Sequence, residues 1–428
     1  FKNIAIEDME IKAEPTVTWE TATDGDQGQK QVCVLTYTEL EPKRYVDSYR
    51  AVYADGANKV GVKLEFTDAV RGEVRPLYYH IYRAAPADDA QVKDELGRDL
   101  GSWQDAMFKA GTEYENFMVM NDLDFADMSI QTGLQVKRLE GYLDSGQYTD
   151  GAFDMEGWSE KQKYEYLMKD PGNGPTEDAH AWPALANLNR TLGEGDSYRA
   201  WFYEISGTMQ YLRFKDIRLT DGHRTGSSEC GIVRINSGTV QYVDFENVEI
   251  DYGKNTSNIG CIAYNQGGLE YVSLRDIRLV SVNRANKQSV NYIGGLCGRS
   301  TRLVSHVSAK GTKTGEEYNY RVEGSSHGAD WTGGVYAGGV VGQSNFGVKY
   351  VFVDTVSVSG ANNTGGLGGN ISNHQVQNLS SETPDPEVGV YAEVKNSRVK
   401  GRSNTGGIYG SGDYHVYNTV AGCDVEAA

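Results

Sequence analysis

Four acidic side chains in the middle of the chain have types and spacing that carbohydrate chemistry uses. Asp244, Glu246 and Glu249 lie in one short segment, and Asp276 follows in a segment of the same pattern. Paired carboxylates cleave glycosidic bonds, and clustered carboxylates also hold calcium. If the two segments lie side by side, the sequence allows a polysaccharide lyase or a glycoside hydrolase.

The remaining residues that could do chemistry lack the spacing of a known site. The seven histidines are scattered, and neither His-Glu-x-x-His nor Gly-x-Ser-x-Gly occurs. Asp24 and Asp26 are weak calcium candidates, because the full loop with its terminal glutamate is missing. Asp122 and Asp124 are equally weak, and turn formation is the favoured interpretation of all four. We therefore expect no catalytic residue, metal site or cofactor in this chain.

A long polar stretch at 140–200 contains aromatic residues of the kind that anchor protein interfaces. Long loops on a regular scaffold commonly carry binding surfaces. The candidate contacts are Trp158, Tyr164, Tyr166, His180 and Trp182. Packing of these side chains against the rest of the protein is the alternative interpretation.

Three segments repeat one pattern and must position the acidic residues. Residues 211–219, 242–250 and 271–279 each begin with tyrosine, alternate apolar residues, and carry Asp or Asn at the sixth position. Alternation with period two predicts strands, and the Asp or Asn predicts a bend. A repeat of about 30 residues is typical of stacked solenoid units.

The outward positions of these repeats favour stacking in parallel register. Lys215, Glu246 and Arg275 share one position of the repeat, and both this column and the next read plus, minus, plus. The second column consists of Arg218, Glu249 and Arg278. Opposite charges on neighbouring strands stabilise each other. This structural role competes with catalysis for the same carboxylates, and we favour it.

A second motif, Gly-Gly-apolar-x-Gly, occurs four times. It starts at Gly294, Gly338, Gly365 and Gly406. Glycine allows sharp corners and close backbone approach. A phosphate-binding loop would need a following Lys and Ser or Thr and a helix, which the sequence lacks. We therefore interpret the glycines as corners between short strands.

These glycine corners, alternating with apolar-x-apolar-x-Asp/Asn-apolar strands, resemble the GLUG repeats of large bacterial surface proteins. The segment from Trp103 through Tyr114 to Phe125 is similar to the one that opens such domains, and residues 207–217 resemble their first full coil. The resemblance covers roughly residues 102–428. The pattern is familiar from the region before the protease domain of Gram-positive immunoglobulin A zinc metallopeptidases, and from adhesins. The long polar insert at 140–200 departs from the GLUG-type pattern, which has a compact first coil there.

The resemblance implies a right-handed parallel β-helix without catalytic activity of its own. It would be a substrate-recognition or spacer region of a large secreted or cell-wall-attached bacterial protein. That region would position a host glycoprotein such as immunoglobulin A, or an extracellular matrix component, for a downstream zinc protease domain. A stand-alone adhesin and a β-helix carbohydrate-active enzyme are the alternatives.

Composition narrows the class of protein further. The formal charge of −18, without clusters of Lys and Arg, argues against a nucleic-acid binder. No apolar run is long enough to predict a membrane span. The five cysteines, Cys33, Cys230, Cys261, Cys297 and Cys423, show neither zinc spacing nor an even count. We expect free thiols.

The expected fold is mainly β, in three parts. Residues 1–84 predict a small immunoglobulin-like or fibronectin-like β sandwich. Residues 85–206 predict a short helical cap, with helices over 87–100 and from Ser102, followed by the start of the solenoid and the irregular insert. Residues 207–428 predict the GLUG-type β-helix, which we expect to continue beyond this chain.

Overall fold

The computed structural model describes the chain in segments, and its contacts divide it into two compact units, Phe1–Asn121 and Asp122–Ala428. The described residues are 9–11, 16–23, 29–37, 40–42, 49–52, 62–66, 74–78, 91–93, 99–102, 116–119, 122–126, 138–139, 141–144, 182–192, 200–221, 229–252, 257–283, 291–326, 335–372, 390–412 and 417–427. All regular elements among them are strands. The fold is therefore mainly β, as expected.

The described strands of the first unit pair mostly antiparallel. One sheet has the order β2-β3-β6-β7, and β1 pairs with β4 and β8 with β9, while β5 and β10 pair in parallel. Their bounds are β1 Met9–Ile11, β2 Thr16–Thr23, β3 Gln29–Tyr37, β4 Leu40–Pro42, β5 Tyr49–Val52, β6 Val62–Phe66, β7 Val74–Tyr78, β8 Gln91–Lys93, β9 Asp99–Ser102 and β10 Asn116–Val119. A sandwich over 1–84 stays a prediction.

The helix expected over 87–100 is wrong where the structure describes this segment. Gln91–Lys93 and Asp99–Ser102 are strands that pair with each other. The helical pattern includes Gly97, and a glycine inside a helix costs about 1 kcal/mol relative to alanine. Strand pairing overrides so weak a local preference. Residues 103–108 of the second expected helix lie outside the described residues.

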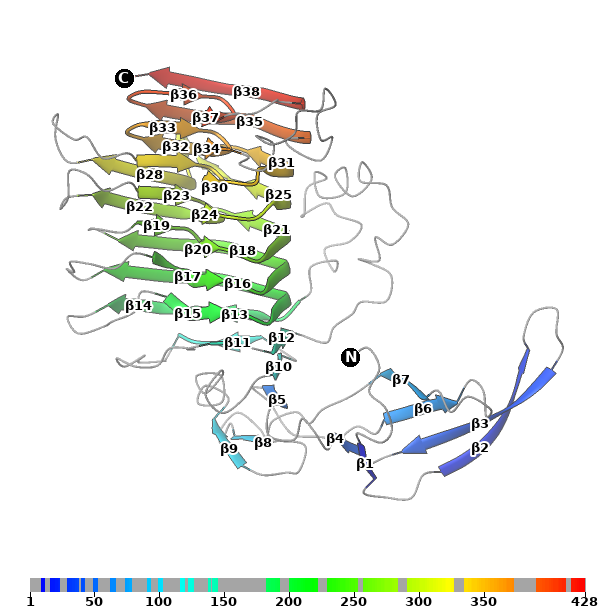
Figure 1. The fold of residues 1–428 in the computed structure, drawn as a ribbon. Coiled ribbons are helices and arrows are strands. Elements are labelled where there is room, and N and C mark those ends of the chain that lie inside the picture. The colour runs from blue at the N-terminus through cyan, green and yellow to red at the C-terminus, as the bar shows by residue number, and fades with distance from the viewer. Residues whose placement is uncertain are drawn as a thin grey trace. The chain divides into compact units, whose positions relative to one another are not determined.

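The second unit is a parallel β-solenoid whose strands are piled as rungs (Figure 1). Its main sheet contains the repeated segments. The strands are β11 Leu123–Asp124, β12 Tyr142–Asp144, β13 Ala184–Ala186, β14 Asn189–Leu192, β16 Thr208–Asp221, β18 Thr239–Tyr252, β21 Gly268–Arg275, β22 Arg278–Asn283, β25 Val304–Lys310, β28 Tyr320–Ser326, β31 Val348–Asp354, β32 Val356–Gly360, β35 Val390–Gly401 and β38 Tyr417–Ala427.

Two further ladders of short parallel strands complete each coil. The first corner ladder runs β17-β19-β23-β29-β33-β36, and the second runs β15-β17-β20-β24-β30-β34-β37. Their bounds are β15 Ala200–Ile205, β17 Glu229–Asn236, β19 Asn258–Ile259, β20 Ile262–Asn265, β23 Asn291–Gly294, β24 Cys297–Ser300, β29 Val335–Gly338, β30 Val341–Ser344, β33 Asn363–Gly365, β34 Gly368–Ile371, β36 Thr405–Gly406 and β37 Tyr409–Gly412. The glycine motifs lie between the two ladders.

The core of the solenoid is built from the alternating apolar residues of the repeats. Phe214 of β16 lies opposite Phe245 of β18 in parallel register, and their rings stack 5.3 Å apart. Both side chains are completely buried. The apolar face predicted from the period-two pattern is thus confirmed. Shifting a strand by one residue would move this face into solvent.

Left-handed residues bend each coil within the main sheet. Asp216, Asn247 and Asp276 have φ angles of 53°, 50° and 50°, which confirms the predicted bend at the Asp or Asn. Asn and Asp adopt this conformation more readily than other non-glycine residues. The tyrosines that open the repeats were not expected to do so, yet Tyr211 and Tyr242 have φ of 54° and 53°. Each repeat therefore has two bends.

The glycine motifs are corners in register, as predicted. Gly294 lies beside Gly338, Gly338 beside Gly365, and Gly365 beside Gly406. A Cβ atom at Gly294 would lie 2.2 Å from the carbonyl oxygen of Cys297. The corner thus needs glycine because the two ladders approach too closely for any side chain.

The irregular insert is shorter than expected. Residues 184–186 and 189–192, assigned to the insert from the sequence, are strands β13 and β14 paired in parallel with β16. Asn187 between them has a φ of 62°, so it repeats the bend of Asp216. Leu185 and Leu188 flank it as Phe214 and Ile217 flank Asp216. That spacing was the signal that could have identified this coil.

Candidate functional site

The four acidic candidates lie in β18 and directly after β21, and two of them, Glu249 and Asp276, contact neighbouring coils through their side chains. Asp276 accepts hydrogen bonds from the backbone N–H of Thr312 at 2.7 Å and from its hydroxyl at 3.0 Å. Glu249 lies between Arg218 and Arg278, at 3.6 Å and 3.7 Å. These carboxylates are partners in contacts between coils rather than a pair facing one reacting bond.

The predicted charge columns are in register. Lys215 pairs with Glu246 and Glu246 with Arg275 along parallel strands, and Arg218, Glu249 and Arg278 pair in the same way. The arginines of the second column are more than half exposed, so each ion pair contributes only about 0.2–1 kcal/mol. The columns therefore specify register more than they add stability.

A ladder of aromatic rings lies at the first bend of the main sheet. Successive ring centroids are separated by 5.0, 4.8, 4.5 and 4.9 Å. The members are Tyr211, Tyr242, Tyr271, His306 and Tyr350, all with φ near 54°. Burial, together with the flanking tyrosines, raises the pKa of Tyr242, so its hydroxyl stays protonated. The tyrosine at the start of each repeat was the visible signal for this ladder.

One of the predicted interface aromatics lies at the end of this ladder. The indole of Trp182 is 3% exposed and packs edge-on against Tyr211, with ring centroids 5.9 Å apart. Its backbone carbonyl accepts a hydrogen bond from Arg213 at 2.8 Å. Trp158, Tyr164, Tyr166 and His180 lie outside the described residues, as do Asp24 and Asp26.

Asp122 and Asp124 have the structural role that the sequence favoured. Asp122 accepts a hydrogen bond from the backbone N–H of Ala184 at 2.7 Å. Asp124 accepts hydrogen bonds from the N–H of Ala126 and the side-chain amide of Asn187, both at 2.9 Å. These contacts fasten β11 to the next coil.

The cysteines whose side chains are described are free thiols, as predicted. Cys230, Cys261 and Cys297 are buried, and Cys423 is partly exposed. Burial raises the pKa of Cys261, and it raises the pKa of Cys297 to about 12. A thiol that stays protonated and covered is neither a nucleophile nor a metal ligand. The side chain of Cys33 is not among those that the structure describes.

A β-hairpin that the sequence did not reveal interrupts the second bend of one coil. Strands β26 Lys313–Thr314 and β27 Glu317–Tyr318 pair antiparallel between β25 and β28. In the adjoining coils the chain passes directly from Asp276 to Ile277, and from Thr355 to Val356. Tyr320 pairs with Val356. Residues 312–319 are therefore an insertion into an otherwise continuous coil, which we call the corner hairpin.

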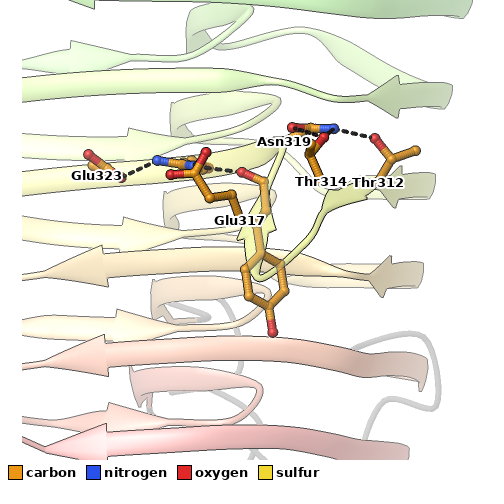
Figure 2. Close-up of polar contacts among 7 residues, drawn as sticks. Thr312, Thr314, Glu317, Asn319 and Glu323 are labelled. Carbon is orange, nitrogen blue, oxygen red and sulfur yellow. Dashed lines mark hydrogen bonds and ion pairs between the residues drawn. The ribbon is translucent and has the colours of Figure 1, made fainter.

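The corner hairpin is held by its own polar contacts (Figure 2). The side-chain amide of Asn319 donates to the hydroxyl of Thr312 at 2.7 Å. Arg321 donates to the carbonyl oxygen of Tyr318 at 2.5 Å and lies 3.4 Å from Glu317. The ammonium group of Lys313 lies 4.1 Å from the ring centroid of Tyr318. These contacts join the two strands of the hairpin to each other and to its ends.

This hairpin presents exposed side chains on a rigid base. Residues 312–317 and 319 are all exposed, whereas Gly311 and Tyr320 at its two ends are buried. An ordered, projecting polar segment suits recognition of another macromolecule. It is the strongest candidate contact surface outside the insert.

The described part of the chain offers no metal centre or membrane span. No three His, Cys, Asp or Glu side chains of the described residues come together to hold a metal ion. Nor do those residues include a helix long and apolar enough to cross a membrane. Comparison with protein-family models, curated proteins and solved structures finds no match.

Proposed function

We propose that this chain is a non-catalytic recognition and spacer region of a large bacterial protein that is secreted or attached to the cell wall. Its solenoid would be a right-handed β-helix of GLUG-type coils, preceded by a small β sandwich. The observation that carries this proposal is that candidate catalytic groups have structural contacts, whereas an ordered polar segment is left exposed. Glu249 and Asp276 use their carboxylates to bind neighbouring coils, while the corner hairpin presents exposed side chains.

A solenoid of stacked coils that carries an ordered, exposed hairpin suits holding a partner at a fixed distance. Each coil adds about 4.8 Å to the length of the solenoid, so the hairpin sits at a defined height on the stack. The partner that we propose is a host glycoprotein such as immunoglobulin A, positioned for a zinc protease domain of the parent protein. The sequence resemblance supports that partner.

The test is binding of the full chain to immobilised immunoglobulin A and to mucin, measured by biolayer interferometry. Two deletion variants separate the candidate surfaces. One lacks residues 312–319, which joins Gly311 directly to Tyr320 as the adjoining coils are joined. The other lacks residues 145–181 of the insert. We expect wild-type binding and its loss in at least one variant that keeps the wild-type circular dichroism spectrum.

Absence of binding to both glycoproteins by the wild-type chain would overturn the proposal, as would binding that both deletions leave unchanged. A separate assay with acidic polysaccharides, with and without calcium, addresses the enzymatic alternative. Release of unsaturated or reducing sugar ends that stops in Asp244→Ala and Asp276→Ala would show that the chain is an enzyme instead.

A further inference from the structure

Two columns of polar and aromatic side chains run along the corner between the two short-strand ladders. The first column follows β19, β23 and β29, and the second follows β24, β30 and β34, each in parallel register. We call these six residues the corner seam. They are Asn258, Tyr292, Tyr336, Arg299, Gln343 and Asn370.

The two columns face each other. The guanidinium carbon of Arg299 lies 5.7 Å from the ring centroid of Tyr292. Asn363 continues the first column beside Tyr336. The side-chain amides of Asn363 and Asn370 both donate hydrogen bonds to the hydroxyl of Ser411, at 2.9 Å, so the two columns are joined there as well. The glycine corner brings the ladders this close, because no side chain separates them there. The seam is therefore a continuous line of facing side chains along the solenoid axis.

Polar atoms in this seam lack partners among the described residues. They are Asn258 Oδ1, Arg299 Nε, Gln343 Oε1 and Asn370 Oδ1. The side chain of Asn258 is only 6% exposed. Buried polar groups in proteins are almost always hydrogen-bonded, so repeated exceptions in successive coils need an explanation. A ligand that supplies hydrogen-bonding groups at the spacing of the coils would provide one.

The chemistry of the seam points to a sugar polymer. Amides and a guanidinium group bind hydroxyls, and tyrosine rings pack against the apolar faces of pyranose rings. The rings of Tyr292 and Tyr336 are 5.2 Å apart and half-buried. The coil spacing of about 4.8 Å is close to the length of one sugar unit in an extended β-linked chain. A repeating ligand would thus meet the same side-chain types at each coil.

We propose that the corner seam binds an extended β-linked glycan, with about one sugar unit for each coil. The amide oxygens of Gln343 and Asn370 are buried, so they accept hydrogen bonds from its hydroxyls once these side chains rotate outward. The six seam residues include no carboxylate, so the glycan is held and not cleaved. The proposal does not depend on the corner hairpin or on a host glycoprotein.

Isothermal titration calorimetry with cellohexaose, chitohexaose and an extended Gly-Ser peptide tests this proposal. We expect the full chain to bind at least one hexaose. Because Gln343→Ala removes one hydrogen-bonding group, it should weaken binding about tenfold. Arg299→Lys should also weaken binding, since a lysine cannot reproduce the planar donors. Arg218→Ala, on the outer face of the main sheet, is the matched control and should leave affinity unchanged.

A measurement on the wild-type chain guards against variants that fail to fold. Saturation with the bound hexaose should change the tyrosine ultraviolet difference spectrum. The variant lacking residues 312–319 should bind the hexaose as the wild type does, which separates this site from the one proposed above. Failure of both hexaoses to bind, tighter binding of the peptide, or unchanged affinity in both seam variants would each overturn the proposal.

Discussion

The hydroxyl of Tyr320 occupies the space into which a side chain at Gly295 would point. A Cβ atom at residue 295 would lie 1.9 Å from that hydroxyl oxygen and 2.3 Å from the carbonyl oxygen of Gly339. The same hydroxyl donates a hydrogen bond to Gly339 at 2.8 Å and is completely buried. Residue 295 must therefore be glycine, because the buried hydroxyl of Tyr320 needs the space that a side chain there would occupy.

Gly295→Ala should therefore destabilise the solenoid. Overpacking of a well-packed core costs about 1–3 kcal/mol, and we expect the upper end because backbone as well as side chain must move. Urea unfolding followed by circular dichroism measures the loss. Gly422→Ala is the control, since its nearest contact for a new Cβ atom is 3.9 Å away. Equal midpoints for both variants would contradict this account of the corner.

The stability of the solenoid should fall at alkaline pH. Burial raises the pKa of Tyr320 well above its usual value. A group whose pKa is raised on folding contributes stability that is complete below its unfolded pKa, about 10, and is lost as the pH rises toward the folded pKa. Urea midpoints measured across this range should decline above about pH 10. Tyr320→Phe should show a smaller decline, and an identical one would rule out Tyr320 as the cause.

Reversing the charge of Glu249, which lies between Arg218 and Arg278, should destabilise the stacked coils. Glu249→Lys places three cations in register and should cost about 1 kcal/mol at low salt. Salt screens exposed charges, so the difference from wild type should shrink at high ionic strength. Thermal melts at two salt concentrations check this. Glu249→Gln removes the attraction without adding repulsion, so its melting temperature should lie between those of the wild type and Glu249→Lys.

The left-handed bend at Asn247 should tolerate glycine better than alanine. Its φ is 50°, and its side-chain amide donates to Asp216 at 2.5 Å. Alanine loses the hydrogen bond and also strains the backbone by about 1–2 kcal/mol, whereas glycine loses only the bond and some chain entropy. Chemical denaturation of Asn247→Gly and Asn247→Ala compares the two. An alanine variant as stable as the glycine variant would argue against this conformation.

The buried thiols should be unreactive until the solenoid unfolds. Iodoacetamide requires thiolate, and burial raises the pKa of Cys261 and Cys297 while covering both sulfur atoms. Peptide mass spectrometry should find Cys230, Cys261 and Cys297 unmodified in the native protein and modified in urea. Cys423, which is partly exposed, is the internal comparison. Rapid native modification of Cys261 would show that the coil opens there.

Local pattern was enough to predict the coil and its register. Alternating residues such as Leu212 and Phe214 can bury one face only as a strand, and Asp216 marks a bend whatever lies beside it. Charges at Glu249 and its neighbours then fixed how repeats align, and the glycine motifs marked corners because only glycine fits there. The strands, bends and corners are each marked by a residue and its near neighbours in sequence, and the register is marked by the spacing of the repeats.

Tertiary structure decided which polar side chains meet. The left-handed tyrosines and the facing columns at Tyr292 and Arg299 depend on contacts between coils, which no local pattern specifies. Similarly, only packing shows that Trp182 is interior and that residues 91–93 pair as a strand. The physical reason is that periodicity assigns a side chain to a face, while its partner on that face comes from tens of residues away.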